Sequence, residues 1–336
     1  MAGIGTGKGD GGKRTFLATP VGLVLGALAC CGLWGSAFPC IKLGYALFGV
    51  ASGDTASQML FAGTRFTLAG IMVVVGMSLA QRKPLVPRKA DIRPILVLAL
   101  FQTVGQYTLF YMGLSKATGM ASSIIESSST FMCILLAALV FHTDRLNANK
   151  VLGCVVGMAG VTLVNLGGAS GGLSFALDGE GLVFLSGISS AISTCLIGIY
   201  SQEHDGVLLS GWQFVIGGLV LLGIGLGMGG QLHPQAIAPA VGLIAYMGFI
   251  SAMAYSLWAR LLSVNPVSRV SVFGFMNPVF GVALSALLLG EGADTNPFVF
   301  LAALSLVCLG IVLVNRDTTP AEKDGEVATC SNGMHK

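Results

Sequence analysis

Tyr107-Thr108-Leu109-Phe110 recurs 148 residues later as Tyr255-Ser256-Leu257-Trp258, and this pair of stretches decides the fold. At the same shift, Arg65-Phe66 falls on Gln213-Phe214, and no gap is needed over the long stretch between the two matches. Each copy is almost entirely apolar. A duplicated apolar unit is typical of transporters, in which the two copies form two walls around one central path.

The composition places the chain in a lipid bilayer. It is 54% hydrophobic and only 10% charged, with a mean hydropathy of +0.82, whereas soluble domains have about 25% charged residues. The Lys and Arg residues lie in short scattered loops, so we expect no nucleic-acid partner. The eight cysteines include no C-x-x-C pair and no histidine at ligand spacing, so we expect no metal and no cofactor.

Ten apolar runs are long enough to cross the membrane as helices. In hydrocarbon every backbone group must bond within its own segment, and barrel strands would be shorter and would alternate in polarity. We therefore predict an all-α integral membrane protein with ten transmembrane helices at 20–43, 56–80, 93–114, 119–141, 148–168, 180–200, 209–229, 237–261, 267–290 and 296–315.

The basic residues predict the orientation. With the N-terminus in the cytoplasm, fifteen Lys and Arg residues fall on the inner side and one, Lys116, on the outer side. This bias predicts a multi-pass protein of the cell (inner or plasma) membrane with both termini cytoplasmic.

Each copy contains five predicted helices, so the second copy enters the membrane from the opposite side. This predicts two inverted repeats, at 20–168 and 180–315, between a disordered cytoplasmic head (1–19) and tail (316–336). Rocking one repeat against the other would open a central cavity to each side in turn.

Four motifs extend over nearly all of residues 20–315. They are Trp34-Gly35-Ser36-Ala37-Phe38, Arg65-Phe66, Asn277-Pro278-Val279-Phe280 running on to Leu289-Gly290-Glu291, and the stretch from Gly310 to Asn315, which also repeats Gly160 to Asn165. Together they resemble the motifs of the EamA-type, ten-helix members of the drug/metabolite transporter superfamily. The resemblance implies a transporter of small metabolites, in many members an exporter, and it does not fix the substrate.

Three charged residues fall within the predicted spans: Lys42, Arg65 and Glu126. Such charges are costly in a bilayer and should face the bundle interior or a wet cavity. Arg65 and Glu126 both lie about 10–15 Å below the outer surface. Glu126 either binds a proton or a cationic substrate group, with Arg65 as its partner or as the anchor of a substrate carboxylate, or it forms a fixed ion pair that locks two helices together. Lys42 lies near a helix end and can reach the interface as an anchor.

Polar side chains in the spans predict a central path, because residues three or four apart share one helix face. For the serines, close helix packing is the alternative, and the aromatic side chains can equally line a packed bundle. The candidate path residues are Arg65, Gln102, Gln106, Tyr107, Ser123, Glu126, Thr130, Ser190, Tyr255, Trp258 and Asn277.

We therefore predict a secondary active transporter, an exporter, that moves a small polar or amphipathic metabolite by alternating access, with proton coupling through Glu126 as a hypothesis. Its partners would be the substrate, the lipid bilayer and protons, and a homodimer is an open alternative. The rival class is a membrane-embedded sensor or enzyme. An enzyme would need paired acids, a nucleophile with its base, or H-E-x-x-H, none of which the spans contain.

Overall fold

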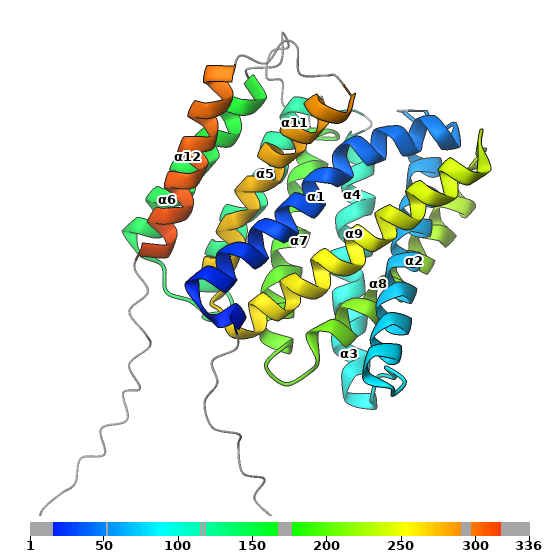
Figure 1. Ribbon diagram of the computed structural model, residues 1–336, viewed down its shortest axis with the longest axis horizontal. Helices are drawn as coiled ribbons and strands as arrows, with labels where there is room; N and C mark the ends of the chain where they lie inside the picture. The colour runs from blue at the N-terminus through cyan, green and yellow to red at the C-terminus, as the bar shows by residue number, and fades with distance from the viewer. Residues whose placement is uncertain are drawn as a thin grey trace, which may run out of the picture.

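The computed structural model describes residues 16–51, 53–114, 116, 119–166, 177–289 and 297–316 (Figure 1). Within these ranges the chain forms helices and no strand, as predicted. The predicted head begins to fold before its expected end, because Phe16–Ala18 form a 3-10 turn and the Thr19 hydroxyl caps the first long helix. The rest of the head (1–15) and the tail beyond 316 lie outside the described residues.

Helices of the two repeats follow one another in the same order. The first repeat contains α1 (Pro20–Phe48), α2 (Thr55–Gln81), α3 (Lys89–Leu98), η2 (Ala99–Gly105), α4 (Gln106–Leu114), α5 (Gly119–Leu139) and α6 (Ala148–Leu166). The second contains α7 (Glu180–Tyr200), α8 (Gly206–Gly227), α9 (Ile237–Val264), α10 (Val267–Ser271), η3 (Val272–Phe275), α11 (Met276–Leu289) and α12 (Pro297–Arg316).

Ten apolar segments result when the broken helices are joined. In the described part of the chain, eight are long and apolar enough to cross a membrane, and two shorter apolar helices lie at Ile125–Leu139 and Ala148–Leu163. The prediction of ten spanning helices is confirmed.

Two of the ten spans contain an irregular stretch, one near its middle and one near its start. η2 is a π-helical stretch between α3 and α4, and η3 is a 3-10 stretch between α10 and α11. The 3-10 stretch has a local cause: Pro278 has no backbone N–H to bond the carbonyl of Gly274, four residues earlier. Breaks of this kind at membrane depth usually lie against protein or a wet cavity.

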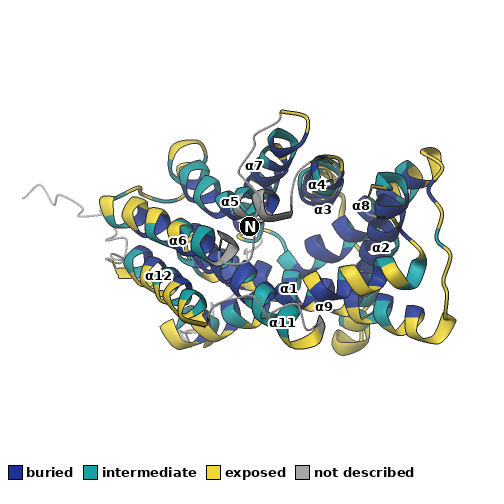
Figure 2. Ribbon diagram, turned by 90° about the horizontal axis from the view of Figure 1, so that it is seen from above, coloured by how far each residue is buried: buried dark blue, intermediate teal, exposed yellow. Residues whose placement is uncertain are grey.

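The helix contacts are preserved when each helix is exchanged with its counterpart in the other repeat. α2 packs against its own counterpart α8, and α6 packs against its counterpart α12. The exchange also turns the α5–α7 contact into the α11–α1 contact, and both are present. Figures 1 and 2 show the α6–α12 pair at one end of the bundle and the α2–α8 pair toward the other.

Glycines make the α2–α8 contact close. A Cβ added to Gly218 would lie 2.4 Å from the Thr67 nitrogen, and one added to Gly63 would lie 2.9 Å from the Gly218 carbonyl oxygen. The exchange predicts a matching contact between Gly70 and Gly211, and a Cβ at Gly70 would lie 2.7 Å from the Gly211 carbonyl oxygen. Small residues at such contacts let membrane helices approach closely.

Loop contacts join only loops that the predicted topology places on the same side. We call the end that carries Phe16 and Arg316 the inner end, and the opposite end the outer end. At the inner end Asn265 donates to the Leu17 carbonyl (2.9 Å). At the outer end the His233 backbone N–H donates to the Phe48 carbonyl (2.9 Å).

A buried ion pair also lies at the inner end. Lys150 binds Asp144, and both side chains are almost fully buried. Asp144 also accepts hydrogen bonds from the backbone N–H and the hydroxyl of Ser268 at the start of α10. This network joins the loop between α5 and α6 to the second repeat.

Candidate functional site

A contact between a residue and its own repeat counterpart lies on the axis that exchanges the two repeats. The described residues include two such contacts. The hydroxyls of Tyr107 and Tyr255, which are 148 positions apart, are hydrogen-bonded at 3.1 Å. The rings of Phe66 and Phe214 stack with centroids 5.2 Å apart and planes within 9°. These four side chains therefore lie on the exchange axis, and we call the region around them the centre.

Further aromatic side chains surround this centre. The rings of Phe66 and Tyr107 lie 4.4 Å apart, and the symmetry-related rings of Phe214 and Tyr255 lie 4.8 Å apart. Trp34 of α1 packs edge-on against Tyr255 at 5.1 Å, and against Trp258 at 5.0 Å. Trp258 therefore packs against other aromatic rings at the centre. Trp34 lies on α1, a helix that had contributed no candidate to the predicted path.

Arg65 of α2 is buried and faces the same centre. Its guanidinium carbon lies 4.3 Å from the centroid of Phe66 and 5.8 Å from that of Tyr107. A cation over an aromatic face is attracted by the ring quadrupole, which offsets part of the cost of burying the charge. Its Nε has no hydrogen-bond partner among the described residues.

Glu126 of α5 reaches the centre from the other side. Its Oε2 is sealed from solvent and has no hydrogen-bond partner within the described ranges. Ion pairs found in the described part of the chain do not join it to Arg65. Both side chains instead lie near the hydroxyls of Tyr107 and Tyr255. The structure thus does not contain the fixed Arg65–Glu126 ion pair that was one of the two sequence-based alternatives.

The π-helical stretch η2 carries further polar groups to the centre. The Thr103 hydroxyl donates to Oε1 of Gln213, the repeat counterpart of Arg65, at 2.7 Å. Gln102 is buried beside the Tyr255 hydroxyl. The Ser189 hydroxyl of α7 donates to the Phe101 carbonyl at 2.7 Å. A π-turn leaves carbonyls out of the regular i→i−4 pattern, so this hydroxyl supports the irregular backbone.

The remaining predicted residues have different surroundings. Thr130 is buried, with its hydroxyl 2.6 Å from the point where a Cβ of Gly274 would stand. Asn277 has a sealed Oδ1 without a partner among the described residues. The carbonyl of Ser190 accepts hydrogen bonds from two hydroxyls further along α7.

Three residues singled out from the sequence remain: Gln106, Ser123 and Lys42. Gln106 is buried at the start of α4. The Ser123 side chain lies outside the described residues. Lys42 is exposed on α1, as expected of an interfacial anchor.

Chemically, the site offers aromatic faces, one cation, one carboxyl group and several polar atoms that still need a partner. Buried polar atoms almost always have one, in protein, water or ligand. Within the part of the chain that the structure describes, no group of His, Cys, Asp or Glu could hold a metal ion. Aromatic faces with a few convergent polar groups are typical of sites that bind small molecules.

Trp34, Phe66 and Phe214 were not among the candidate path residues predicted from the sequence. The repeat itself held the signal for the two phenylalanines, because identical residues at matching positions of inverted copies can meet on the axis. No sequence signal marks the π-turn that recruits Ser189.

Comparisons with known proteins agree with this architecture. The model of the EamA-like transporter family matches residues 21–166 and 177–316, one match for each repeat. An uncharacterized transporter of Synechocystis is 26% identical over 299 residues, covering 84% of this chain and 87% of that protein. A WAT1-related chloroplastic protein of Arabidopsis thaliana is 25% identical over 311 residues, covering 90% of this chain and 71% of its own length.

The uncharacterized inner membrane transporter YedA of Escherichia coli is 25% identical over 287 residues, covering 84% of this chain and 87% of YedA. A solved crystal structure of a protein superimposes with a TM-score of 0.71 over 89% of this chain and 98% of that one, at 15% identity, which shows a shared fold. The family and its relatives are named as transporters, which agrees with a multi-pass membrane protein that handles a small molecule. The chain belongs to the EamA-like transporter family.

Proposed function

We propose that this protein is a secondary active transporter, an exporter, that moves a small polar or amphipathic metabolite by alternating access through the centre marked by Tyr107 and Tyr255. The observation that carries the proposal is the hydrogen bond between these two hydroxyls. It places the meeting point of the repeats among aromatic rings and beside a buried cation and a buried carboxyl group.

The charges give the site its chemistry. Arg65 can hold an anionic group of the substrate, and Glu126 a cationic group or a proton. Among the described residues, no ion pair joins Arg65 to Glu126. Each charge can therefore interact with a substrate without first breaking a salt bridge between the two. The second repeat has Gln213 and Gly274 at the equivalent positions, so the charges belong to one repeat only.

Transport by this site requires that the centre face each side in turn. The glycine contacts between α2 and α8 form a close central interface about which the two repeats can rock. Proton coupling follows if Glu126 takes up a proton from water on one side of the membrane and releases it on the other side when substrate binds.

The test uses purified protein in proteoliposomes. A thermal-shift screen of small zwitterionic, cationic and anionic metabolites selects a radiolabelled probe, whose efflux is then measured with and without a pH gradient. We expect Glu126→Gln to abolish the dependence on the gradient, while Glu203→Gln, at an exposed carboxyl near the inner end, keeps it.

Two results would count against the proposal in different ways. A Glu126→Gln protein with the wild-type pH dependence would refute proton coupling and leave transport intact. Probes that stabilise the protein and yet are never moved across the membrane would refute transport, and they would favour a sensor.

A further inference from the structure

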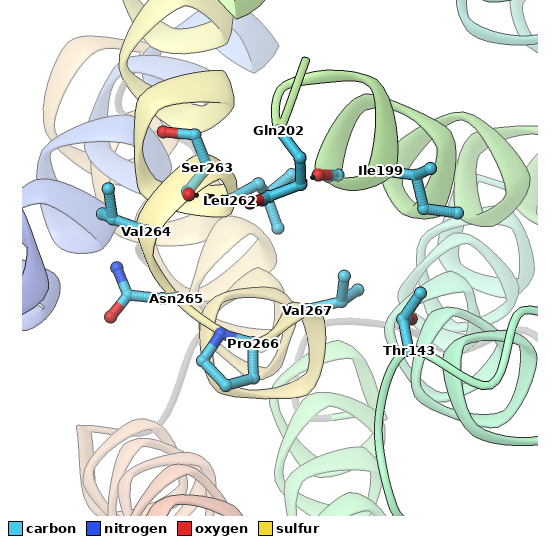
Figure 3. Close-up of a pocket in the computed structure, with 10 residues that line it drawn as sticks. Thr143, Ile199, Gln202, Leu262, Ser263, Val264, Asn265, Pro266 and Val267 are labelled. Atoms are coloured by element: carbon cyan, nitrogen blue, oxygen red, sulfur yellow. Dashed lines mark hydrogen bonds between the residues drawn. The ribbon is translucent and has the colours of Figure 1, made fainter. Parts of the chain in front are cut away.

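A pocket of about 520 Å³ opens at the inner end (Figure 3). Figure 3 shows side chains from the ends of α7 and α9, from the start of α10 and from the loop after α5 around one space. Its lining includes Thr143, Gly198, Gln202, Leu262, Asn265 and Val267.

These elements are the ones that carry the central site further up. α5 carries Glu126 and Thr130, α7 carries Ser190, and α9 carries Tyr255 and Trp258. Trp258 lies one turn above the pocket residue Leu262, and Tyr255 about one turn higher. The pocket and the centre are therefore two levels of one seam through the bundle.

A layer of small polarisable side chains separates the two levels. The Cys133 thiol lies 3.8 Å from the Cys195 thiol and 3.3 Å from the Ser271 hydroxyl, and all three residues are buried. Cys195 lies three residues before the pocket residue Gly198, and Ser271 lies four residues after the pocket residue Val267. The layer is thus about one helical turn, or roughly 5 Å, above the pocket.

The same seam continues from the layer to the centre. Glu126, Thr130 and Cys133 are spaced by four and three residues, so they lie on one face of α5. Thr130 faces Gly274 on η3, where only a glycine fits against its hydroxyl. Between Glu126 and the layer, the side chains on this face of α5 are thus small.

We propose that the pocket is the inner vestibule of the transport path, and that the layer of Cys133, Cys195 and Ser271 is the constriction that closes it. This inference rests on the proposed function. The constriction joins α5 of the first repeat to α7 and α10 of the second, so it separates when the repeats rock apart. Thiols are weak donors and acceptors, and their contacts oppose opening only slightly.

Cross-linking the constriction tests the inference. The full-length chain keeps Cys133 and Cys195, has its other six cysteines replaced by alanine, and carries a protease site between residues 167 and 176. Iodine joins the two thiols: each loses a proton, a disulfide forms, and the two electrons released convert one iodine molecule to two iodide ions. After cleavage, the two halves should stay together until they are reduced.

The readout is a reporter above the constriction, Thr130→Cys, in inside-out vesicles. A membrane-impermeant maleimide is added and the modified peptides are identified by mass spectrometry. We expect labelling of residue 130 to fall about tenfold after cross-linking, because the open population is removed, and to recover after reduction. The matched control carries Cys195→Ser, in which iodine should change nothing.

Other outcomes would overturn the inference. Labelling of residue 130 that ignores the cross-link would show that the path does not pass this layer. A reporter that is labelled from neither side in the reduced protein would show that no hydrated path reaches it. Failure to cross-link in folded protein would show that the thiols do not meet.

Two further measurements keep the result interpretable. If the cysteine replacements prevent folding, the native cysteines are retained and mass spectrometry separates their peptides. Probe efflux that continues unchanged in cross-linked protein would refute the constriction and leave the transport proposal standing, whereas absence of efflux from reduced protein would refute transport itself.

Discussion

Substituting Gly218 by alanine should separate the two repeats at a close contact between α2 and α8. The added Cβ would lie 2.4 Å from the Thr67 nitrogen and 2.5 Å from its hydroxyl oxygen, whereas ordinary contacts begin at 3.4 Å. Because one of these atoms belongs to the backbone, the helices must move apart by about 1 Å. Overpacking of this kind costs about 1–3 kcal/mol.

Gly223 provides a control on the same helix. It is exposed, and a Cβ there would meet nothing within 4 Å. Alanine is favoured over glycine inside a helix by about 0.8–1.0 kcal/mol at either position. The propensity gain therefore cancels in the difference between the two variants, which isolates the cost at the interface.

The assay is thermal unfolding in detergent, followed by size-exclusion chromatography with fluorescence detection. We expect Gly218→Ala to lose folded protein several degrees below Gly223→Ala, since each kcal/mol shifts Tm by about 2–4 °C in domains of 150–250 residues. Gly70→Ala should behave like Gly218→Ala, because its Cβ would lie 2.5 Å from the Val215 nitrogen. Equal stability of all three variants would refute a close α2–α8 interface.

Three further predictions concern polar contacts. Tyr107→Phe and Tyr255→Phe should each weaken probe efflux. A double-mutant cycle of thermal stability should give a coupling energy of about 0.6 kcal/mol, up to about 1.7 kcal/mol, as for other hydrogen bonds in membrane proteins. Strictly additive effects of the two substitutions on stability would exclude the contact. Ser189→Ala should lower stability by about 1 kcal/mol by removing the partner of a π-turn carbonyl, and a stability equal to that of the wild type would show that water replaces the hydroxyl. Burial raises the pKa of Asp144, but hydrogen bonds from Lys150 and Ser268 outweigh this effect and leave the pKa below its usual value. The stability that this group contributes is therefore present above its unfolded pKa of about 3.9, and it is lost as the pH falls through the lower folded value. Acid should thus destabilise the wild type more than Asp144→Asn.

Periodicity and length were enough to predict the spans from sequence. Each apolar run is long enough to span a bilayer, and nothing else can satisfy its backbone there. The site was less accessible. Tyr107, Tyr255 and Trp258 were found because polar-tipped aromatic residues stand out in a span, whereas Phe66 and Phe214 resemble any lipid-facing residue. The π-turn at η2 depends on tertiary partners in α7 and α8, and a single-sequence pattern does not record these.

Symmetry and chemistry diverge in this molecule, and the divergence has a physical consequence. The scaffold repeats itself closely enough that Phe66 meets Phe214 and Tyr107 meets Tyr255 on the exchange axis. If the two repeats were chemically identical, the inward-facing and outward-facing forms of the proposed cycle would be related by a two-fold rotation and equal in free energy. Arg65 and Glu126 occur in the first repeat only, where the second has Gln213 and Gly274.

The contacts that join the two repeats at the inner end also break the symmetry. There the buried Lys150–Asp144 pair and the bonds from Ser268 tie the two repeats together. Removing one partner of a buried pair leaves an uncompensated charge, which is costly. Opening the inner end must therefore move this network as a unit or expose it to water. In the proposed alternating-access cycle, the energy of this network would therefore enter only the step that opens the inner end.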